Sequence, residues 1–400
     1  MAKEEKKAPK LRFNGYTNDW ERKKLGILIT RVKSYPLSRS VEVKKETDVK
    51  YVHYGDIHTN IADEIDKNNN LPFINEIYKE YDELKLDDVI VADASEDYKG
   101  IADAAVIISN LPYTIIAGLH TIALRPTSLI KGYFLYHIFK TENFKRFGYK
   151  IGTGLKVFGI SYNNLAKYKV YYPQEIEEQK KIIGILSNLT NSINLHERKC
   201  EELALIKKAL LQKLFPKKDE INPEVRYKNF NDAWEQRKLG EVAHIETGKL
   251  DANAMVENGK YDFYTSGIKK YRIDIPAFKG PAITIAGNGA TVGYMHLADG
   301  EFNAYQRTYV LTKFLANRHF IFSEIGNKLP RKIQQESRAG NIPYIVMDML
   351  TDLQLFLPSI AEQEKVGELL NKLNSLITLH QRKLEKLKQL KKFLLQNMFI

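Results

Sequence analysis

The sequence predicts an α/β protein built as an internal repeat, in which two α/β domains alternate with two long helices that pair with each other as a coiled coil within the chain. Three observations predict this class. The segment from Glu178 to Phe215 is repeated without a gap from Glu362 to Phe399. Both copies space their apolar residues as a coiled coil does. A shorter motif also occurs twice, at a different offset. Because a long ungapped match indicates duplication, the repeat defines the organisation of the chain.

The two helices are predicted from heptad spacing. In the first copy the seam residues step by four and three, and they are Ile182, Leu186, Leu189, Ile193, His196, Cys200 and Leu203. The second copy repeats the seam with Val366, Leu370, Leu373, Ile377, His380, Leu384 and Leu387. Beyond Leu203 the apolar pattern moves to Ile206, Leu210 and Leu214, a three-residue step that predicts local overwinding. Each helix is expected to be about 55–60 Å long, at about 1.5 Å per residue.

The seam also predicts its own partner. A single helix of this kind leaves its leucines in water, which costs about 1.5–3 kcal/mol for each large side chain. The other copy is the simplest partner. The histidine present in both seams has three interpretations: a polar pair that fixes register, a buried pH-sensitive site, or a half-exposed residue at the edge of the seam. We favour the edge interpretation, because helix seams carry such residues routinely.

Composition and charge restrict the class of protein. The chain has 400 residues with 44% hydrophobic and 28% charged residues, which is ordinary for a globular protein of two or three domains. Its net charge of +12 favours an anionic partner such as nucleic acid. Cys200 is the single cysteine, which excludes an intramolecular disulfide and a cysteine-rich metal site. The charged N-terminus is no secretory signal, and no apolar run is long enough for a membrane span, so we expect a cytoplasmic protein without a membrane partner.

A second repeat marks the start of each half. Leu11-Arg12-Phe13 with Trp20-Glu21 matches Val225-Arg226-Tyr227 with Trp234-Glu235. Because this motif repeats at a larger offset than the helices do, the first half is longer between its motif and its helix. We therefore divide the chain into a disordered tail (1–10), a first domain (11–173), a first helix (174–215), a linker (216–224), a second domain (225–358) and a second helix (359–400).

Both domains read as α/β. In the first, strands are predicted at Tyr51-Val52-His53-Tyr54, at Val89-Ile90-Val91 and at Ala105-Val106-Ile107-Ile108, with a helix around Gly132 to Phe147. In the second, strands are predicted at Ala282-Ile283-Thr284-Ile285 and Tyr309-Val310-Leu311, with a turn at Gly287-Asn288-Gly289 and a helix around Phe314 to Ile325. Pro173 and Pro358 end the strands before the two helices.

No catalytic motif is complete. Asn110-Leu111-Pro112-Tyr113 and Asn341-Ile342-Pro343-Tyr344 approach the Asn-Pro-Pro-Tyr loop of amino-methyltransferases, but both lack the first proline and they occupy different places in the two halves. Turn formation explains them better. The glycine clusters at 152–154 and 287–293 lack the residues that a phosphate-binding loop needs. The nine histidines show no metal spacing and no nucleophile triad. We expect no catalytic residue and no metal or cofactor site in this chain.

Polar loop residues are the candidates for binding. Arg, Lys, Asn and Gln read base edges or hold phosphates, and tyrosine packs against bases or sugars. Ordinary solvated loops have the same composition, so the residue type alone does not decide between the two. The candidate DNA-binding residues are Lys150, Thr153, Lys156, Tyr162 and Asn163 in the first domain and Lys249, Asn288, Thr291, Tyr294, Gln306, Arg307 and Arg338 in the second.

The order of motif, domain and helix, written twice, resembles the specificity subunit of type I restriction-modification enzymes. The likeness lies in Leu11-Arg12-Phe13 with Trp20-Glu21-Arg22-Lys23-Lys24-Leu25-Gly26, in the copies at Val225 and Trp234, and in Glu178-Gln179 and Glu362-Gln363 at the helix starts. Thr247-Gly248-Lys249 and Gly287-Asn288-Gly289-Ala290 also look like segments of that family. The resemblance covers essentially the whole chain after Lys10.

The resemblance implies a non-catalytic subunit of a restriction system in host defence. Each domain is then a target recognition domain that reads half of a bipartite, asymmetric DNA sequence, and the helices pair antiparallel as spacers. Double-stranded DNA, two modification (methyltransferase) subunits and ATP-dependent restriction subunits are the implied partners. S-adenosylmethionine, ATP and Mg are expected on those partners. Two other classes remain open: a DNA adenine methyltransferase in its own right, and a coiled-coil structural scaffold.

Overall fold

The computed structural model describes residues 8–75, 78, 80–96, 100–154, 158–217, 220–336 and 343–400. The chain forms two compact units. The first unit contains Met1–Leu195 together with Leu384–Ile400, and the second contains His196–Lys383. Each unit therefore combines one α/β domain with segments of both long helices. Parts of the chain far apart in sequence complete each unit.

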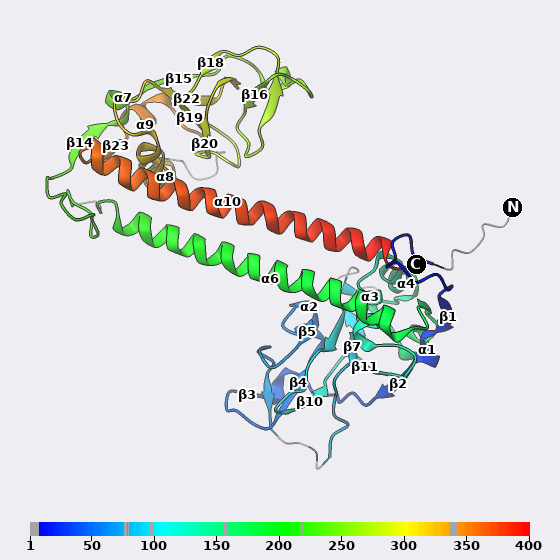
Figure 1. The fold of residues 1–400 in the computed structure, drawn as a ribbon. Coiled ribbons are helices and arrows are strands. Elements are labelled where there is room, and N and C mark those ends of the chain that lie inside the picture. The colour runs from blue at the N-terminus through cyan, green and yellow to red at the C-terminus, as the bar shows by residue number, and fades with distance from the viewer. Residues whose placement is uncertain are drawn as a thin grey trace. The chain divides into compact units, whose positions relative to one another are not determined.

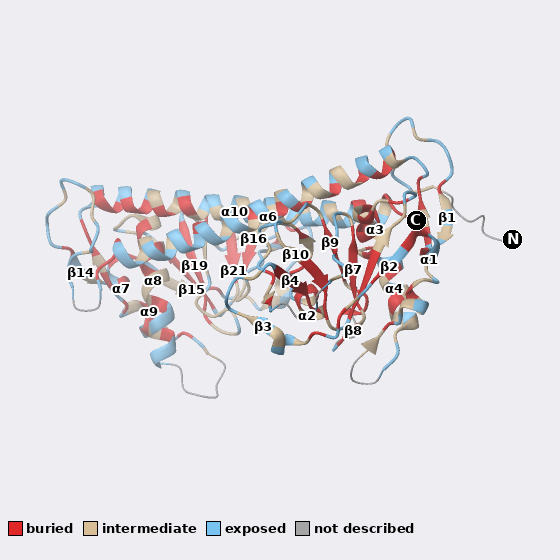
Figure 2. Cartoon of the chain, turned by 90° about the horizontal axis from the view of Figure 1, so that it is seen from below, coloured by how far each residue is buried: buried red, intermediate tan, exposed pale blue. Residues whose placement is uncertain are grey.

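The two long helices are α6 (Ile176–Lys213) and α10 (Ile360–Asn397) (Figure 1). In the first unit Lys391 donates a hydrogen bond to Thr190, and in the second a ring nitrogen of His196 bonds to one of His380. From Thr190 to His196 the residue number in α6 rises, while the number of the bonded residue in α10 falls from Lys391 to His380. The helices therefore run antiparallel, which confirms the predicted coiled coil. Buried and exposed residues alternate along both helices (Figure 2).

The seam follows the prediction over most of its length and departs from it at one position. Among the predicted seam residues, Ile182, Leu186, Ile193, His196, Leu203, Val366, Leu370 and Leu373 are buried, whereas Leu189, Cys200, Ile377, His380, Leu384 and Leu387 are half-buried. The predicted slip to Ile206 is wrong, because Ile206 is 48% exposed. The heptad instead continues through the half-buried Lys207, and Lys391 holds the equivalent position in the second copy.

The first unit contains two main sheets, and its larger one has the strand order β2-β11-β7-β9-β5. The smaller sheet has the order β10-β4-β6-β3. The strands are β1 (Glu21–Lys24), β2 (Ile29–Val32), β3 (Glu42–Val43), β4 (Val49–Val52), β5 (Glu64–Ile65), β6 (Phe73–Ile74), β7 (Val89–Ala92), β8 (Ala94–Ser95), β9 (Ala104–Ile107), β10 (Thr114–Ala117), β11 (Thr121–Pro126), β12 (Phe158–Gly159) and β13 (Lys169–Tyr172). The helices are α1 (Leu25–Leu28), α2 (Tyr54–His58), α3 (Gly132–Phe139), α4 (Glu142–Ile151) and α5 (Tyr162–Leu165), with a 3-10 turn at Arg39–Val41.

The second unit repeats this plan. Its main sheet has the order β15-β22-β19-β20 and its smaller sheet the order β17-β16-β21-β18. The strands are β14 (Glu235–Lys238), β15 (His244–Thr247), β16 (Tyr261–Tyr264), β17 (Tyr271–Ile273), β18 (Phe278–Lys279), β19 (Ala282–Ala286), β20 (Met295–Ala298), β21 (Glu301–Ala304), β22 (Thr308–Thr312) and β23 (Gln354–Leu357). The helices are α7 (Leu239–Val242), α8 (Arg318–Glu336) and α9 (Met347–Thr351), with a 3-10 turn at Ala252–Ala254.

Strand pairing establishes which elements of the two domains are equivalent. In the first main sheet β2 follows α1 and pairs antiparallel with β11, which also pairs antiparallel with the central strand β7. In the second, β15 follows α7 and pairs antiparallel with β22, which also pairs antiparallel with the central strand β19. That central strand pairs antiparallel with β9 in the first unit and with β20 in the second. In the smaller sheets, the β4–β10 pair and the β16–β21 pair are both parallel. The first main sheet has one strand more, because β5 pairs with β9.

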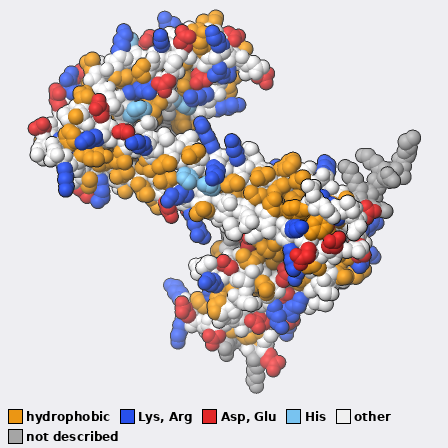
Figure 3. Space-filling view, in the orientation of Figure 1, with side chains coloured by type: hydrophobic (Ala, Val, Ile, Leu, Met, Phe, Trp, Pro, Cys, Tyr) orange, Lys and Arg blue, Asp and Glu red, His pale blue; other side chains and the backbone are white. Residues whose placement is uncertain are grey.

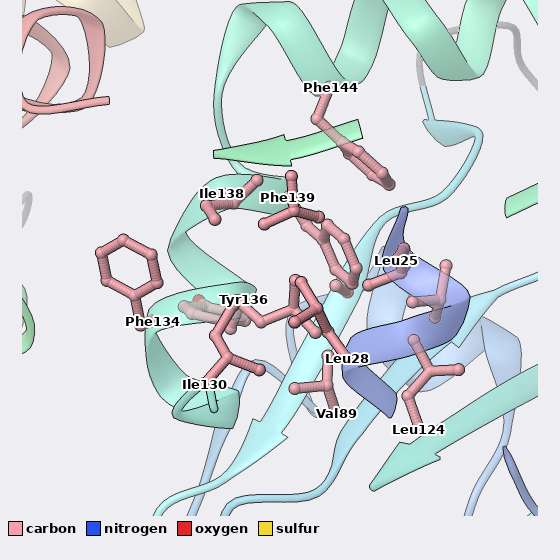
Figure 4. Close-up of a cluster of buried hydrophobic side chains, with 14 of the residues drawn as sticks. Leu25, Leu28, Val89, Leu124, Ile130, Phe134, Tyr136, Ile138, Phe139 and Phe144 are labelled. Atoms are coloured by element: carbon pink, nitrogen blue, oxygen red, sulfur yellow. The ribbon is translucent and has the colours of Figure 1, made fainter. Parts of the chain in front are cut away.

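A continuous apolar core joins each domain to the helices. In the first unit, buried residues of α1, β7 and β11 pack against the aromatic side chains of α3 and α4 (Figure 4). Leu394, Met398 and Phe399 from the end of α10 belong to the same core, where the ring of Phe399 lies 5.3 Å from that of Phe134. In the second unit Phe215 takes the equivalent position, with its ring 5.2 Å from that of Phe320. The end of one helix thus completes the domain that precedes the other.

The repeated N-terminal motifs are anchors to the helix starts. Arg12 donates from Nε and Nη2 to the two carboxylate oxygens of Glu178, at 2.7 and 2.9 Å. Arg226 does the same to Glu362, at 2.8 and 2.8 Å. Both glutamates are 1% exposed and lie in the first turn of their helices. The motif found in the sequence is therefore structural, because it joins each domain to its helix by a buried bidentate ion pair.

Several predicted elements have different limits. His53 and Tyr54 do not continue strand β4, because His53 caps α2 by accepting a hydrogen bond from the Gly55 amide at 3.2 Å. The helix predicted around Gly132 to Phe147 is two helices, and Thr141 caps the second of them by accepting from the Phe144 amide. The helix predicted at Phe314 to Ile325 is α8, which begins at Arg318 because the side chain of Asn317 caps it, and which extends to Glu336. The other predicted strands lie within β7, β9, β19 and β22, although Ile108 follows β9.

Candidate nucleic-acid interface

Three loops of the second domain meet where strands of both sheets end. They follow the carboxyl ends of β16, β19 and β21, and they comprise residues 265–267, 287–293 and 305–307. Ser266 donates from Oγ to Oδ1 of Asn288 at 2.6 Å, and Thr291 donates from its hydroxyl to the Ser266 carbonyl. The Gly287 amide donates to the Arg307 carbonyl at 2.8 Å. These bonds bring side chains from distant parts of the sequence into one group.

Gly287 is at the centre of this group for a steric reason. A Cβ atom on Gly287 would overlap the carbonyl oxygen of Arg307, closer than real contacts allow. The same glycine accepts a hydrogen bond from the Ile345 amide at 2.7 Å, and Asn288 forms a β-bridge with Tyr344. The segment before α9 is therefore the fourth member of the loop group. Tyr344 is 57% exposed beside it.

The loop group carries polar side chains that point to water. Gln306 and Arg307 are exposed, and Lys249 is exposed on the segment beside them. The Gln306 amide donates to the Leu250 carbonyl at 2.8 Å, which holds the Lys249 segment against the 305–307 loop. Amide and guanidinium groups are the side chains that form bidentate bonds with base edges, and lysine binds phosphate as a point charge. The group has the donors and acceptors that DNA recognition requires.

The first domain forms an equivalent group at the same strand ends. There the Asp93 amide donates to the His120 carbonyl at 3.0 Å, and the Ile160 amide donates to the Asp93 carbonyl at 2.8 Å. These two bonds match the ones that Gly287 makes to Arg307 and Ile345. Asp93 therefore takes the place of Gly287, and His120 takes the place of Arg307.

Aromatic and imidazole rings dominate this first-domain group. The ring of Tyr54 lies 4.5 Å from that of His53, 5.8 Å from that of His58 and 5.3 Å from that of His120. Nδ1 of His120 lies 3.1 Å from Oδ1 of Asp93. His58 donates from Nε2 to the Ala94 carbonyl at 2.9 Å. Burial and the charge of Arg39 lower the pKa of His53, so its ring is neutral and accepts the Gly55 amide. The two domains thus present different chemistry on one scaffold.

The candidate residues of the second domain separate into two groups. Asn288, Thr291, Gln306 and Arg307 belong to the loop group, and Lys249 lies on the segment held against it. Tyr294 lies beside it, with its ring 4.9 Å from that of His296, and it also lines a pocket next to α6. Arg338 lies outside the described residues.

The candidate residues of the first domain are more dispersed. Thr153 forms a β-bridge with Gly159, which connects it to the Asp93 loop. Tyr162 begins α5, and the guanidinium of Arg31 lies 5.3 Å from its ring centre. Lys150 ends the polar face of α4 and Asn163 is exposed on α5, without a contact to the loop group among the bonds of the described residues. Lys156 lies outside the described residues.

Sequence reasoning missed the main side chains of the first group: Tyr54, His58, Asp93 and His120. Three of the nine histidines of the chain, His53, His58 and His120, meet there, yet no two of them have a spacing that indicates a site. The different lengths of the two domains hide their equivalence in the sequence. Only strand pairing aligns Asp93 with Gly287. In the second domain Ser266 and Tyr344 were missed for the same reason.

The near-matches to a methyltransferase loop have no common setting. Tyr113 follows an exposed turn, and the ammonium of Lys50 lies 4.5 Å from its ring centre. Asn341 and Ile342 of the second near-match lie outside the described residues. Among the described residues, no group of three or more His, Cys, Asp or Glu side chains is placed to bind a metal ion. None of the helices in the described ranges is both long and apolar enough to cross a membrane.

Comparison with known proteins supplies the family. The "Type I restriction enzyme EcoDI specificity subunit" of Escherichia coli is 36% identical over 159 residues, which are 40% of this chain and 35% of that protein. The "Type I restriction enzyme MjaVIII specificity subunit" of Methanocaldococcus jannaschii is 25% identical over 260 residues, or 54% of this chain and 58% of that one. The chain thus spans about a third to three fifths of the length of these relatives.

A solved structure shares the fold. The crystal structure of the type I restriction-modification system S subunit from M. genitalium matches with a TM-score of 0.73 and 16% identity, and the match covers 98% of this chain and 99% of that one. The family described as "Type I restriction modification DNA specificity domain" matches residues 17–205 and 231–389, well over half of the chain. Since both halves match that family, the chain belongs to the family of type I restriction-modification DNA specificity domains.

Proposed function

We propose that this chain is the DNA sequence-recognition subunit of a type I restriction-modification complex and has no catalytic activity of its own. One observation carries the proposal. Two domains of the same fold present different polar groups at the same strand ends, Arg307 with Asn288 in one and His120 with Asp93 in the other. A bipartite, asymmetric DNA target requires two such readers, because each half-site offers its own pattern of donors and acceptors.

The charge of the chain supports DNA as the partner. The net charge of +12 favours the phosphate backbone and supplies a salt-dependent, sequence-independent part of the affinity. Sequence discrimination then comes from side chains that reach base edges. We assign that role to the two loop groups, because they combine exposed hydrogen-bonding side chains with a backbone fixed by several hydrogen bonds.

The helices take the roles of spacer and docking surface in this proposal. Leu195 and Leu379 are equivalent in the two copies, and they are 65% and 60% exposed. Leu205 is 67% exposed on α6. Figure 3 shows hydrophobic side chains over parts of the helix surface that faces the viewer. Exposed leucines on a repeated surface favour the docking of two equal partners, which we take to be modification subunits.

Partner subunits supply the chemistry. S-adenosylmethionine belongs to the modification subunits, and ATP and Mg belong to the restriction subunits. The adenine to be methylated has to leave the DNA stack, so the bound DNA is distorted by the assembled complex. This chain contributes the choice of sequence and the distance between the half-sites.

A methylation map tests the assignment of half-sites. A host that carries this chain and its modification subunit is expected to methylate one bipartite motif. Arg307→Ala should relax or abolish recognition in one half-site and leave the other unchanged, and His120→Ala should act on the opposite half-site. Lys279→Ala is the matched control. This exposed lysine lies opposite Glu301 in the β18–β21 strand pair, at the start of β21, whereas the loop group follows the other end of β21.

Three results would contradict the proposal. If both substitutions changed the same half-site, the two domains would not be separate readers. If neither changed the motif while the domains stayed folded, the loop groups would not contact bases. If the purified chain alone bound S-adenosylmethionine and transferred methyl groups to DNA, it would be a methyltransferase.

A further inference from the structure

The edge of the main sheet is covered in the first unit. Strand β5 pairs parallel with β9, with the Val106 amide donating to the Asp63 carbonyl at 2.8 Å and the Ile108 amide donating to the Ile65 carbonyl at 2.9 Å. This short strand brings the carboxylates of Asp63 and Glu64 between the domain and the helices. Both edge amides are satisfied by it.

Those carboxylates face cations. Asp63 accepts hydrogen bonds from the hydroxyl of Tyr136 at 2.6 Å and from the ammonium of Lys140 at 2.8 Å. Burial opposes ionisation of Asp63, but the charge of Lys140 lowers its pKa. Burial also lowers the pKa of the seam lysine Lys391, while the charges of Glu64 and Asp63 act in the opposite direction. The added strand thus places two carboxylates where their charges favour the protonated form of Lys391, although the ion pair of Asp63 is with Lys140.

Two matching hydrogen bonds to the long helices show which residues of the second unit correspond to those around β5 in the first. Gln179 accepts a hydrogen bond from the Lys131 amide at 2.8 Å, and its copy Gln363 accepts one from the Asn317 amide at 2.9 Å. Lys131 and Asn317 precede α3 and α8 by one residue. Counting along the two helices aligns Tyr136, His137 and Lys140 with Phe322, Ser323 and Gly326. The seam residues Thr190 and Lys391 align with Asn374 and Lys207.

The second unit has no strand at this place among its described residues. Its main sheet ends at β20, and a pocket of about 490 Å³ lies beside that edge. Met295, His296 and Leu297 of β20, Phe322, Ser323 and Gly326 of α8, and Lys207 and Asn374 of the long helices contribute to its lining. Where the first unit has His137 and Lys140, the second has the smaller Ser323 and Gly326. Among the described residues, therefore, nothing fills in the second unit the space that β5 fills in the first.

Two backbone amides at the open edge have no hydrogen-bond partner among the described residues. The Ala286 amide donates to the Tyr294 carbonyl, and the Gly293 amide donates to the Ala286 carbonyl. Hydrogen-bonded residues alternate along an antiparallel ladder, so the β20 residues whose backbone bonds to β19 are His296 and Ala298. The amides of Met295 and Leu297 consequently point away from β19. Leu297 is the equivalent of Val106, whose amide binds β5. The β20 edge offers a partner strand the same bonds that β9 gives to β5.

Lys207 is the charged group of the pocket. In the described part of the chain no acidic side chain forms an ion pair with Lys207, although burial lowers its pKa. The other polar side chains in the pocket lining are Tyr294, His296, Ser323, Asn374 and Thr378, and none of them is acidic. A half-buried ammonium without a counter-charge is unfavourable, and it gains most from a carboxylate delivered into the pocket.

We propose that the β20 edge and Lys207 form a docking site for an extended, acidic peptide segment of a partner protein, which adds parallel to β20 as β5 adds to β9. The first unit supports this occupant, because it fills the equivalent space with its own segment 63–65, which contains β5. Backbone hydrogen bonds to β20 provide affinity, and an ion pair between a peptide carboxylate and the Lys207 ammonium provides selectivity. This site adjoins the DNA-reading loops at Gly293 and Tyr294, but it binds a peptide and not DNA, so it goes beyond the proposed function.

A synthetic peptide with the sequence of residues 61–67 of this chain is the probe, because it contains β5 and both carboxylates. We expect saturable binding to the full-length chain, and slower hydrogen exchange of the amides in segment 293–299. Lys207→Met should weaken binding about tenfold or more, since methionine fills the seam position without the charge. Lys208→Met is the control, because this neighbour is exposed on α6. A peptide in which all three acidic residues, Asp63, Glu64 and Asp66, are changed to the corresponding amides should bind the original chain as weakly as the unchanged peptide binds the Lys207→Met variant.

Each of the other outcomes overturns the proposal. An absence of saturable binding to the folded chain would show that the edge does not accept a strand. Equal affinity for the Lys207→Met variant would remove the charge argument. If amide hydrogen exchange slowed only in segment 104–108, the peptide would instead be displacing β5 from the edge of β9 in the first unit. DNA recognition by the Lys207→Met variant should stay unchanged, so failure here is distinguishable from failure of the proposed function.

Discussion

The ion pair between Arg226 and Glu362 is expected to be essential for the second unit. Glu362 is 1% exposed and Arg226 is 15% exposed, and both guanidinium bonds are 2.8 Å long. Arg226→Met leaves a buried carboxylate without its counter-charge. Removing one partner of a buried pair costs about 3–5 kcal/mol, whereas removing both costs much less. We therefore expect Arg226→Met to destabilise the unit by about 3–5 kcal/mol.

The equivalent change in the first unit should cost less. Trp20 donates from Nε1 to Glu178 at 3.4 Å, so that carboxylate keeps one bond when Arg12 is replaced by methionine. In the second unit the indole nitrogen of Trp234 has no hydrogen-bond partner among the described residues. The two units thus form a matched comparison within one chain.

The two tryptophans allow each unit to be measured separately. Trp20 and Trp234 are the only tryptophans and lie one in each unit. Urea unfolding followed by fluorescence reports on the second unit in a Trp20→Phe background and on the first in a Trp234→Phe background. The double variant Arg226→Met/Glu362→Leu should recover most of the lost stability. A cost below about 1 kcal/mol for Arg226→Met, or no recovery in the double variant, would refute the reasoning.

Three further predictions concern the core and the seam. Burial holds the pKa of His137 well below its usual value, so the folded unit binds fewer protons than the unfolded chain, and stability present above about pH 6.5 is lost as the pH falls. His137→Phe should remove up to about 2 kcal/mol of the loss between pH 7 and pH 5, measured by urea unfolding at both pH values, and an unchanged pH slope would contradict this. Ile206→Lys should change stability by less than about 0.5 kcal/mol while Leu203→Lys, at a buried seam position, costs several times more in thermal unfolding. Inserting one heptad at matched places in both helices should keep the seam in phase and lengthen the spacer between methylated half-sites, whereas a four-residue insertion should lower stability.

The internal repeat could be identified from the sequence alone, and the repeat was enough to predict the fold class. Heptad spacing identified the seam up to Leu203, because a long periodic pattern is dominated by packing between the helices. It failed at Ile206 since the more apolar residue was chosen over the one in phase. The helix keeps its 3.5-residue period there and accepts Lys207, whose long aliphatic stem packs in the seam while the residue also lines the pocket beside β20.

The candidate sites were predictable only in part. Asn288, Gln306 and Arg307 were found because glycine-rich turns with polar residues are visible in sequence. In the first domain Asp93, the counterpart of Gly287, and His120, the counterpart of Arg307, were not found, since the loops that hold them differ in length and composition from those of the second domain. The grouping of loops depends on which strands are neighbours, and strand order is not contained in local sequence patterns.

The place of Phe399 in the first core has a consequence for biosynthesis. A ribosome releases the whole of the first domain long before it makes the last turns of α10, yet Leu394, Met398 and Phe399 are needed to close that domain's interior. The nascent first domain therefore waits with an unfilled apolar surface while the whole second unit is still to be translated. A frameshift or premature stop before Leu394 would damage the first-made domain, and chaperones that shield apolar surface are the expected protection during that interval.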